Sequence, residues 1–378
     1  MSLPDPSQTT GSPADYRDLG ARVWSDSVPS GAAEALPELY NSLLATPGWS
    51  RYFDDTEATG ACLLEDPRHV LLFTVAGDTI EVLNKFFDIA PEDAARACKA
   101  LFRALPQARR IHLEVKFPPA GLRLPKRVLY ATDHMVIPLP TTVEEYTASL
   151  GKRTRSNLRQ YERRLRRDHP DVTLSVQPVE GRSEELFRQF FAWKTERFEP
   201  RHLTTYWRDN PAFAARFVQL LGDRGEAYEA AVDGGTAALW FVFMIGESMY
   251  SYQGSFDPRY EPYAMGTLMH YWVACDAIRR GAARVHLGWG PVSHNAFMRR
   301  FGAVPVTATR LSVFRSQTAR LYSPRESLET VRRNLEPRAR RTFRRTRHAA
   351  GKLLGRRRPC PAGDTGADRS PTAPPPSP

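Results

Sequence analysis

The sequence predicts an α/β (α+β) protein made of two tandem halves, each a mixed, mostly antiparallel sheet flanked by helices. The chain has 378 residues, of which 42% are hydrophobic and 25% charged, a size and composition suited to about two globular domains. After residue 170, segments with strand and helix patterns follow in the order β-α-α-β-β-β-α-β-α-β. The first half repeats the later part of this order. Such a mixed order favours a mostly antiparallel sheet with helices on both faces.

The first half begins with a helix whose leucines recur at helical spacing, and three short apolar runs then form a meander. Its second helix opens with Pro91, Glu92 and Asp93, residues typical of a first helical turn. The helices are expected at 31–44 and 91–105. The strands are expected at 60–64, 69–75, 79–87, 110–115 and 128–139.

The second half opens with one long, charged helix that ends before His169-Pro170. Gly234-Gly235 and Gly246-Glu247 supply the residues that tight turns need between three meandering strands. The helices are expected at 143–167, 183–198, 211–221, 262–280 and 293–301. The strands are expected at 172–179, 227–232, 236–245, 248–255, 284–287 and 304–314.

Composition divides the chain into five segments. We expect a disordered start at 1–15, a first folded half at 16–141, a second folded half at 142–316, a basic helical extension at 317–358 and a disordered tail at 359–378. The net charge is +11, and residues 320–358 alone hold 14 Lys and Arg against three Glu. A second basic excess lies at 152–167. Both basic segments are solvated helices or, alternatively, surfaces for tRNA or another anionic partner.

Several classes of protein are excluded by pattern. No window holds the roughly 18 apolar residues of a membrane span, and the first thirty residues lack the basic and apolar regions of a secretory signal. The four cysteines lie far apart with no C-x-x-C pair, so neither a disulfide scaffold nor a zinc site is expected. A reducing, cytoplasmic location is therefore predicted. Walker, H-E-x-x-H and G-x-S-x-G motifs are absent from the sequence.

Four groups of residues carry a family resemblance. They are the basic run 151–165, Gly254-Ser-Phe-Asp-Pro-Arg-Tyr260 with Met265-Gly-Thr-Leu268, the strand and loop 281–291, and Phe297-Met-Arg-Arg-Phe-Gly302. In this order they resemble the GCN5-related N-acetyltransferase (GNAT) superfamily, in a branch related to the Fem-type aminoacyltransferases. The resemblance covers residues 150–315 in detail and residues 30–140 by architecture only.

The resemblance implies an N-acyltransferase that moves an acyl group, acetyl in the simplest case, from a coenzyme A thioester to an amine without a metal. Residues 172–314 are then expected to form a split sheet with a helix tip beneath Gly266, where backbone N–H groups and the helix dipole suit a pyrophosphate. The residues expected to bind the donor are Gln253, Gly254, Tyr263, Ala264, Gly266 and Thr267.

Further residues are expected to line the acceptor side or to take part in catalysis. The acceptor candidates are Lys194, Arg197, His202, Trp240 and Tyr250, and the catalytic candidates are Tyr252, His286, His294 and Asn295. Each also has a structural interpretation, such as core packing for the aromatic residues, a hydrogen-bonded strand residue for His286 and a helix cap for Asn295.

Two departures from the family pattern keep other functions open. The loop 260–266 has one glycine and the acidic Glu261, where acetyl-CoA users carry Arg/Gln-x-x-Gly-x-Gly/Ala, and Phe297-Met298 stands where relatives often have Tyr-Lys. The alternatives are an aminoacyl-tRNA-dependent transferase of the Fem kind and an inactive relative that binds an anionic partner.

Overall fold

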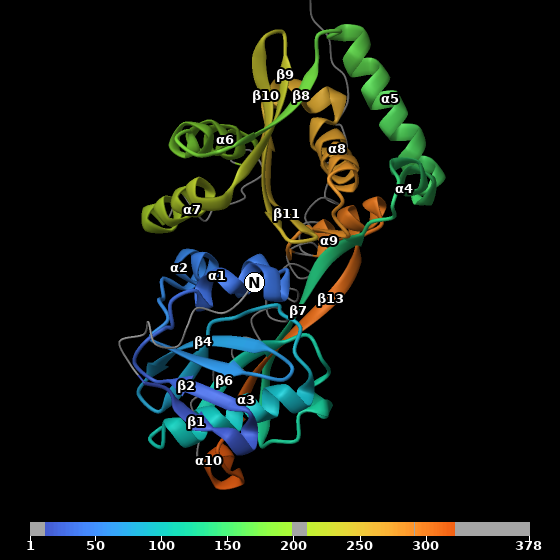
Figure 1. Ribbon diagram of the computed structural model, residues 1–378. Coiled ribbons are helices and arrows are strands. Elements are labelled where there is room, and N and C mark those ends of the chain that lie inside the picture. Colours follow the sequence, from blue (N-terminus) through green and yellow to red (C-terminus); the bar gives the residue numbers. More distant parts are fainter. Residues whose placement is uncertain (1–11, 199–209, 291, 322–378) are drawn as a thin grey trace, which may run out of the picture. The chain divides into compact units, whose positions relative to one another are not determined.

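The computed structural model describes residues 12–198, 210–290 and 292–321, which Figure 1 draws as ribbons. The chain divides into two units, 1–323 and 324–378, and every described residue belongs to the first. The predicted tail 359–378 and most of the predicted basic extension therefore lie outside the described residues. Strand β1 (Ala14–Tyr16) includes the last two residues of the segment 1–15 that we expected to be disordered.

A single sheet of thirteen strands runs through the described part of the chain, in the order β1-β2-β3-β4-β5-β6-β13-β7-β12-β11-β10-β9-β8. The pairs β5–β6 and β11–β12 are parallel and the other neighbours are antiparallel. This confirms the predicted mixed, mostly antiparallel fold class. The remaining strands are β2 (Ala21–Trp24), β3 (Gly60–Leu64), β4 (His69–Ala76), β5 (Thr79–Val82), β6 (Arg110–Val115), β7 (Lys126–Pro138), β8 (Thr173–Pro178), β9 (Glu226–Val232), β10 (Gly235–Ile245), β11 (Ser248–Phe256), β12 (Arg284–His286) and β13 (Val304–Phe314).

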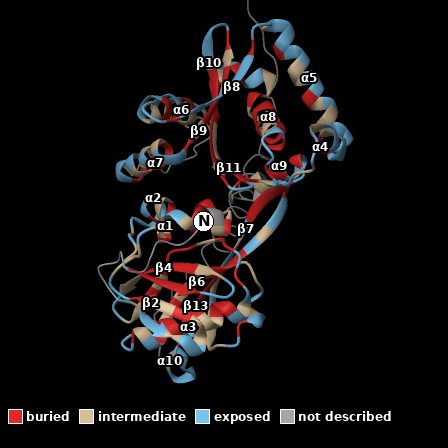
Figure 2. Ribbon diagram, viewed as in Figure 1, coloured by how far each residue is buried: buried red, intermediate tan, exposed pale blue. Residues whose placement is uncertain are grey.

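Helices flank the sheet, and three hydrophobic clusters fill the space between them (Figures 1 and 2). One cluster packs α3 on the strands of the first half, a second packs α8 in the second half, and a third lies between α2, α6, α7 and the sheet. The α-helices are α1 (Ala32–Tyr40), α2 (Pro47–Asp54), α3 (Pro91–Ala104), α4 (Val143–Ser149), α5 (Lys152–Asp168), α6 (Ser183–Phe198), α7 (Pro211–Arg224), α8 (Met265–Arg279), α9 (Val292–Met298) and α10 (Gln317–Leu321).

The two halves share a topology and exchange their last strands. Three antiparallel strands, a helix and a parallel fourth strand occur as β3-β4-β5-α3-β6 and again as β9-β10-β11-α8-β12. The next strand of each half pairs with the other half: β13 is hydrogen-bonded to β6, and β7 is hydrogen-bonded to β12. These pairings join the two predicted halves into one sheet. A domain boundary between residues 141 and 142 stays a prediction.

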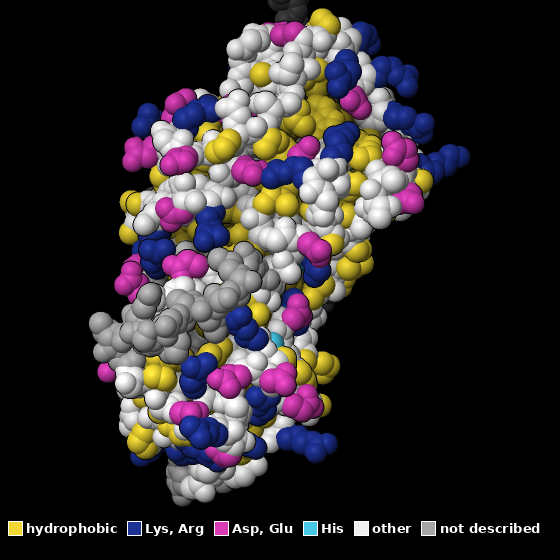
Figure 3. Space-filling view, viewed as in Figure 1, with side chains coloured by type: hydrophobic (Ala, Val, Ile, Leu, Met, Phe, Trp, Pro, Cys, Tyr) yellow, Lys and Arg dark blue, Asp and Glu magenta, His cyan; other side chains and the backbone are white. Residues whose placement is uncertain are grey.

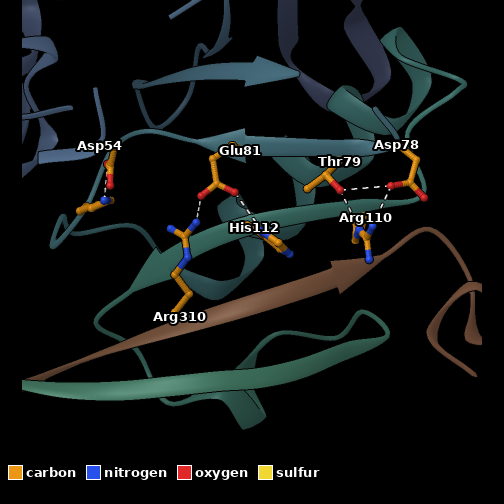
Figure 4. A network of polar contacts seen from close by, with 8 residues as sticks. Asp54, Asp78, Thr79, Glu81, Arg110, His112 and Arg310 are labelled. Carbon is orange, nitrogen blue, oxygen red and sulfur yellow. Dashed lines mark hydrogen bonds and ion pairs between the residues drawn. The ribbon is translucent and has the colours of Figure 1, made fainter. Parts of the chain in front are cut away.

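An ionic contact fixes the exchanged strand in place. Arg310 on β13 forms an ion pair with Glu81 on β5, and Nδ1 of His112 on β6 lies 2.9 Å from the other carboxylate oxygen of Glu81 (Figure 4). Arg310 is only 8% exposed. Because a buried guanidinium without a carboxylate is costly, Glu81 stabilises β13 beside β6.

Several predicted helices differ from the structure in where they begin or end. The helix expected at 31–44 already ends at Tyr40, because Asn41 adopts a left-handed conformation with φ of 46°. The charged helix expected at 143–167 is broken into α4 and α5, because Leu150 and Gly151 have extended ψ values of 145° and 144°. The helix expected from Pro262 begins at Met265, after a 3-10 helix η6 (Pro258–Tyr263) that ends at Ala264 in the left-handed region, with φ of 53°. A proline at the first position of η6 and another at the fifth favour this tighter turn.

Within the described ranges, no helix is both long and apolar enough to cross a bilayer. No group of three or more His, Cys, Asp and Glu side chains in the same ranges could hold a metal ion.

Candidate functional site

The sheet opens between β11 and β12 in the second half. Ser248, Met249 and Tyr250 pair with residues 284–286, and the two strands then diverge. Beyond His286 the chain turns toward β7, where the Leu287 amide donates to the Met135 carbonyl at 2.8 Å and the Met135 amide donates to the Gly288 carbonyl at 2.8 Å. The rest of β11 therefore borders a gap on this side, and the predicted split of the sheet is present.

The first half has no such opening. Its parallel strands β5 and β6 pair over residues 79–81 and 110–112, and a further parallel bridge joins Phe87 to Val115. Phe86 and Phe87 are both buried. The parallel strands of the first half thus stay bridged beyond their ladder, whereas β11 and β12 separate after Tyr250.

A cavity of about 670 Å³ lies at the split. Side chains and backbone from α6, β10, β11, η6, the first turns of α8, the turn after β12 and α9 form its walls. The lining residues are Lys194, Arg197, Trp240, Ser251, Tyr252, Gln253, Gly254, Phe256, Glu261, Ala264, Gly266, Thr267, His270, Leu287, Gly288, Trp289, His294, Phe297 and Met298.

The N-terminus of α8 is one wall of this cavity. Ala264, Gly266 and Thr267 line it, and the positive end of the helix dipole attracts an anion there. A Cβ added to Gly266 would lie 3.0 Å from a ring carbon of Phe256. The glycine thus lets the helix start pack closely on the end of β11.

A second glycine sets the floor of the cavity. A Cβ on Gly254 would lie 2.1 Å from the indole ring of Trp240, its cross-strand partner on β10. Trp240 is 5% exposed, so the ring covers Gly254 and has little room to move.

A β-bulge shapes β11 at the mouth of the split. Phe241 pairs with Gln253 and Val242 pairs with Ser251, so Tyr252 is the extra residue on β11. Bulges re-aim side chains beside active sites. Burial raises the pKa of Tyr252 well above its usual range, so its hydroxyl stays protonated at neutral pH.

Two basic side chains of α6 reach into the cavity. Lys194 Nζ donates a hydrogen bond to the side-chain carbonyl of Gln253. Burial, with a smaller contribution from the charge of Arg197, lowers the pKa of Lys194 to about 7. The guanidinium of Arg197 lies 3.8 Å from the ring centre of Phe256, close to the start of α8.

The sequence model described as "Acetyltransferase (GNAT) domain" matches residues 152–295, the segment that contains the split, the bulge and the helix start. The chain contains a GNAT domain. The comparison with curated protein sequences finds no match.

Solved structures with low sequence identity share the fold. The structure of FemX has 12% identity and a TM-score of 0.56, covering 79% of this chain and 99% of FemX. A protein of unknown function from Bacteroides thetaiotaomicron has 13% identity and a TM-score of 0.52, with 76% and 98% covered. L-PGS from Bacillus licheniformis has 12% identity and a TM-score of 0.51, with 83% and 98% covered. At these identities the likeness establishes the fold alone.

Most of the candidate site residues named from the sequence line this cavity. From α6, β10 and β11 it includes Lys194, Arg197, Trp240, Tyr252, Gln253 and Gly254, and from α8 and α9 it includes Ala264, Gly266, Thr267 and His294. Asn295 follows His294 on α9, and its Oδ1 is buried with no hydrogen-bond partner among the described residues. His202 lies outside the described residues.

Three candidates lie elsewhere in the domain. The rings of Tyr250 and His286 stack in parallel at 4.2 Å, and the Tyr250 hydroxyl donates to the carbonyl of Asn41 at 3.2 Å. Tyr263 turns toward α5, where its hydroxyl lies 3.3 Å from a carboxylate oxygen of Asp168. None of the three belongs to the cavity lining.

The His294 ring packs closely on Gly290 at the cavity edge. A Cβ on Gly290 would lie 2.6 Å from its ring. Burial lowers the pKa of His294, opposed by a hydrogen bond with the backbone of Leu287 and aided by the charge of Lys194. The imidazole is therefore mostly neutral at pH 7.

Sequence reasoning missed Ser251, Phe256, His270 and Trp289, which also line the cavity. His270 follows Gly266 by four residues, one helical turn, and this spacing placed it on the same face. Trp289 lies between two glycines directly after β12, a position at the carboxyl end of a parallel strand where ligands of α/β sheets commonly bind.

Proposed function

We propose that the protein transfers an acyl group, in the simplest case acetyl, from a coenzyme A thioester to an amine of its acceptor. The observation that carries this proposal is the divergence of β11 and β12 beside the N-terminus of α8. An acyl-CoA needs both features, because its long amide-containing arm can pair with a strand edge and its pyrophosphate suits a helix start.

The gap at residues 251–254 of β11 offers backbone groups to the donor arm. Binding there places the thioester near the bulge at Tyr252, where a backbone N–H polarises its carbonyl and stabilises the oxyanion formed on attack. The amine then approaches from the side of α6, where Lys194 and Arg197 lie. Holding both reactants in one cavity makes the attack effectively intramolecular.

Thermal unfolding with acetyl-CoA tests the donor site. We expect a saturable rise of several degrees in the Tm, because a ligand that binds only the folded state stabilises it. Gly266→Trp fills the cavity at the helix start and should abolish the rise. Gly151→Trp is the control, since a Cβ on Gly151 meets nothing within 4 Å. No rise for the wild-type protein would refute the proposed donor.

A second candidate is transfer of an aminoacyl group from tRNA, and the outer face of α5 favours it. Figure 3 shows a row of Lys and Arg side chains over this helix. Arg153, Arg159 and Arg163 are exposed and have no acidic partner within the described ranges. Phosphates bound along such a face release counterions, so the affinity falls steeply with salt.

Titration with bulk tRNA at 50 mM and 200 mM salt separates the two candidates. Tight binding that weakens steeply with salt, and that is lost when Arg153, Arg159 and Arg163 are changed to Glu, would favour the aminoacyl donor. Binding of acetyl-CoA without any tRNA binding would favour the thioester.

A cytoplasmic location stays a prediction, in keeping with the free thiols of Cys62, Cys98 and Cys275.

A further inference from the structure

The cavity brings together six titratable side chains from five elements. Lys194 and Arg197 come from α6, Tyr252 from β11, Glu261 from η6, His270 from α8 and His294 from α9. An amine acceptor arrives mainly as an ammonium ion at neutral pH and must lose a proton before or during attack. One of these side chains is placed to accept that proton.

Lys194 lies where the reacting groups would meet. Its Nζ is hydrogen-bonded to Gln253, the residue that follows the bulge on β11, at the part of the strand that has left β12. The ring of Phe190, one turn earlier on α6, lies 5.0 Å from the same Nζ. The amine thus contacts the side chain of Gln253 and the ring of Phe190 at the mouth of the split.

We propose that the amine of Lys194 removes the proton from the acceptor ammonium during acyl transfer. This inference deepens the proposed function and rests on it. It assigns a catalytic role to a side chain that was expected to bind the acceptor, and it specifies the acceptor as a protonated primary amine.

The step balances in atoms and charge. Neutral Lys194 takes one proton from the R–NH₃⁺ group and becomes an ammonium, and the freed R–NH₂ attacks the thioester carbonyl. The new C–N bond forms first and gives a tetrahedral oxyanion, and the C–S bond breaks when this oxyanion collapses to the amide. The departing thiolate takes the proton of the new amide nitrogen directly or through Lys194, and release of one proton to solvent returns Lys194 to its neutral form.

The surroundings favour Lys194 over His270 and Tyr252. Its pKa of about 7 leaves a large neutral fraction at neutral pH, and a base works best when its pKa is close to the working pH. Burial, with the charge of His294, lowers the pKa of His270 to about 3, which makes that imidazole a weak base. Tyr252 is kept protonated by burial.

Competitive labelling with acetic anhydride, followed by mass spectrometry, tests the lysine without donor or acceptor. The labelling rate of Lys194 should rise with pH to half its maximum near pH 7 in the wild-type protein. In Gln253→Glu, the added carboxylate should move this midpoint at least one pH unit higher, because a nearby negative charge favours the ammonium. A wild-type midpoint near that of an ordinary lysine would overturn the proposal.

Two probe acceptors then test the reaction itself. With acetyl-CoA at pH 7, Lys194→Arg and Lys194→Met should acetylate ethylamine about 100-fold or more slowly than the wild type. The loss should be much smaller for hydroxylamine, which is largely unprotonated at pH 7 and needs no base. Equal losses for both probes would assign Lys194 a structural role only.

Binding of acetyl-CoA to the same variants keeps the two proposals apart. We expect Lys194→Arg to bind acetyl-CoA as the wild type does while losing the reaction with ethylamine. If the wild type does not bind acetyl-CoA, the proposed function fails. If it binds and Lys194→Arg acetylates ethylamine at the wild-type rate, the role of Lys194 fails alone.

Discussion

The phenolic oxygens of Tyr52 and Tyr252 lie 3.3 Å apart and form a hydrogen bond. Tyr52 belongs to α2 in the first half of the chain, and Tyr252 is the bulged residue of the cavity on β11. The indole of Trp49 packs edge-on against the Tyr252 ring at 5.2 Å. The first half, which has no opening of its own, thus positions a side chain of the candidate site.

Tyr52→Phe removes this hydrogen bond, and we expect it to cost about 1 kcal/mol of the free energy of unfolding and to weaken acetyl-CoA binding. Tyr40→Phe is the matched control, because the Tyr40 hydroxyl bonds the backbone of Val70 in the first half. Tyr40→Phe should lose at least as much stability in urea denaturation, because its hydroxyl both donates to the Val70 carbonyl and accepts from the Val70 amide. A control that weakens acetyl-CoA binding as much as Tyr52→Phe would show that general loosening is responsible.

Gly254→Ala should destabilise the domain by about 1–3 kcal/mol, the usual cost of overpacking a buried site. The new Cβ would lie within 2.1 Å of the Trp240 ring, so the indole must shift and narrow the cavity. Urea denaturation and acetyl-CoA titration measure the two effects. Gly151→Ala, in open space with a φ of −56°, should change neither, and a stable Gly254→Ala that binds normally would contradict the packing.

His286→Phe should make the protein less sensitive to acid. Burial, with the charges of Lys116 and Arg284, lowers the pKa of His286 to about 3, so unfolding lets it bind a proton at any pH between about 6.5 and 3. The buried neutral imidazole therefore costs no stability above about pH 6.5, and the free energy of unfolding falls as the pH falls from about 6.5 to about 3. Denaturation at pH 7 and pH 4 should show a smaller difference for the variant.

The same variant separates packing from catalysis. Both ring nitrogens of His286 are buried without a hydrogen-bond partner within the described ranges, and a phenyl ring preserves the stack on Tyr250. We expect acetyl transfer to continue at close to the wild-type rate. A loss of 100-fold or more in a stably folded His286→Phe protein would restore this residue as a catalytic candidate.

Lys194→Met should change how stability depends on alkaline pH. The folded pKa of Lys194 is about 7, against 10.5 for an ordinary lysine, so the unfolded chain binds the extra proton between these values. Wild-type stability should therefore fall as the pH falls from 10.5 to 7. Lys194→Met should lack this component when unfolding is measured at pH 7 and pH 10. Parallel curves for both proteins would contradict the lowered pKa.

The sequence was sufficient for elements whose signals are local. The segment 91–105 carries its own start signal and forms α3 at Pro91–Ala104. The charged helix was predicted too long, because the acidic segment before Leu150 and the arginine-rich segment after it both favour a helix, and only the extended conformation at Leu150 and Gly151 separates α4 from α5. Periodicity cannot detect a single extended residue pair.

The candidate site was predictable where consecutive elements form it. Gln253, Gly254 and Gly266 come from a strand and the helix that directly follows it, and such neighbours in sequence are neighbours in space. The contact of Lys194 with Gln253 joins residues 59 positions apart. The contact of Tyr52 with Tyr252 joins residues 200 positions apart. Both depend on how helices pack across the sheet, which no local pattern encodes.

The exchange of β7 and β13 has a consequence for synthesis on the ribosome. When residue 141 has been added, the sheet of the first half still lacks β13, the strand that covers its edge at β6, and that strand is more than 160 residues away in the message. The edge of the first half at β6 therefore stays uncovered until β13 has been synthesised. Expressing either half alone should yield an insoluble product, whereas producing both from separate messages in one cell should restore solubility.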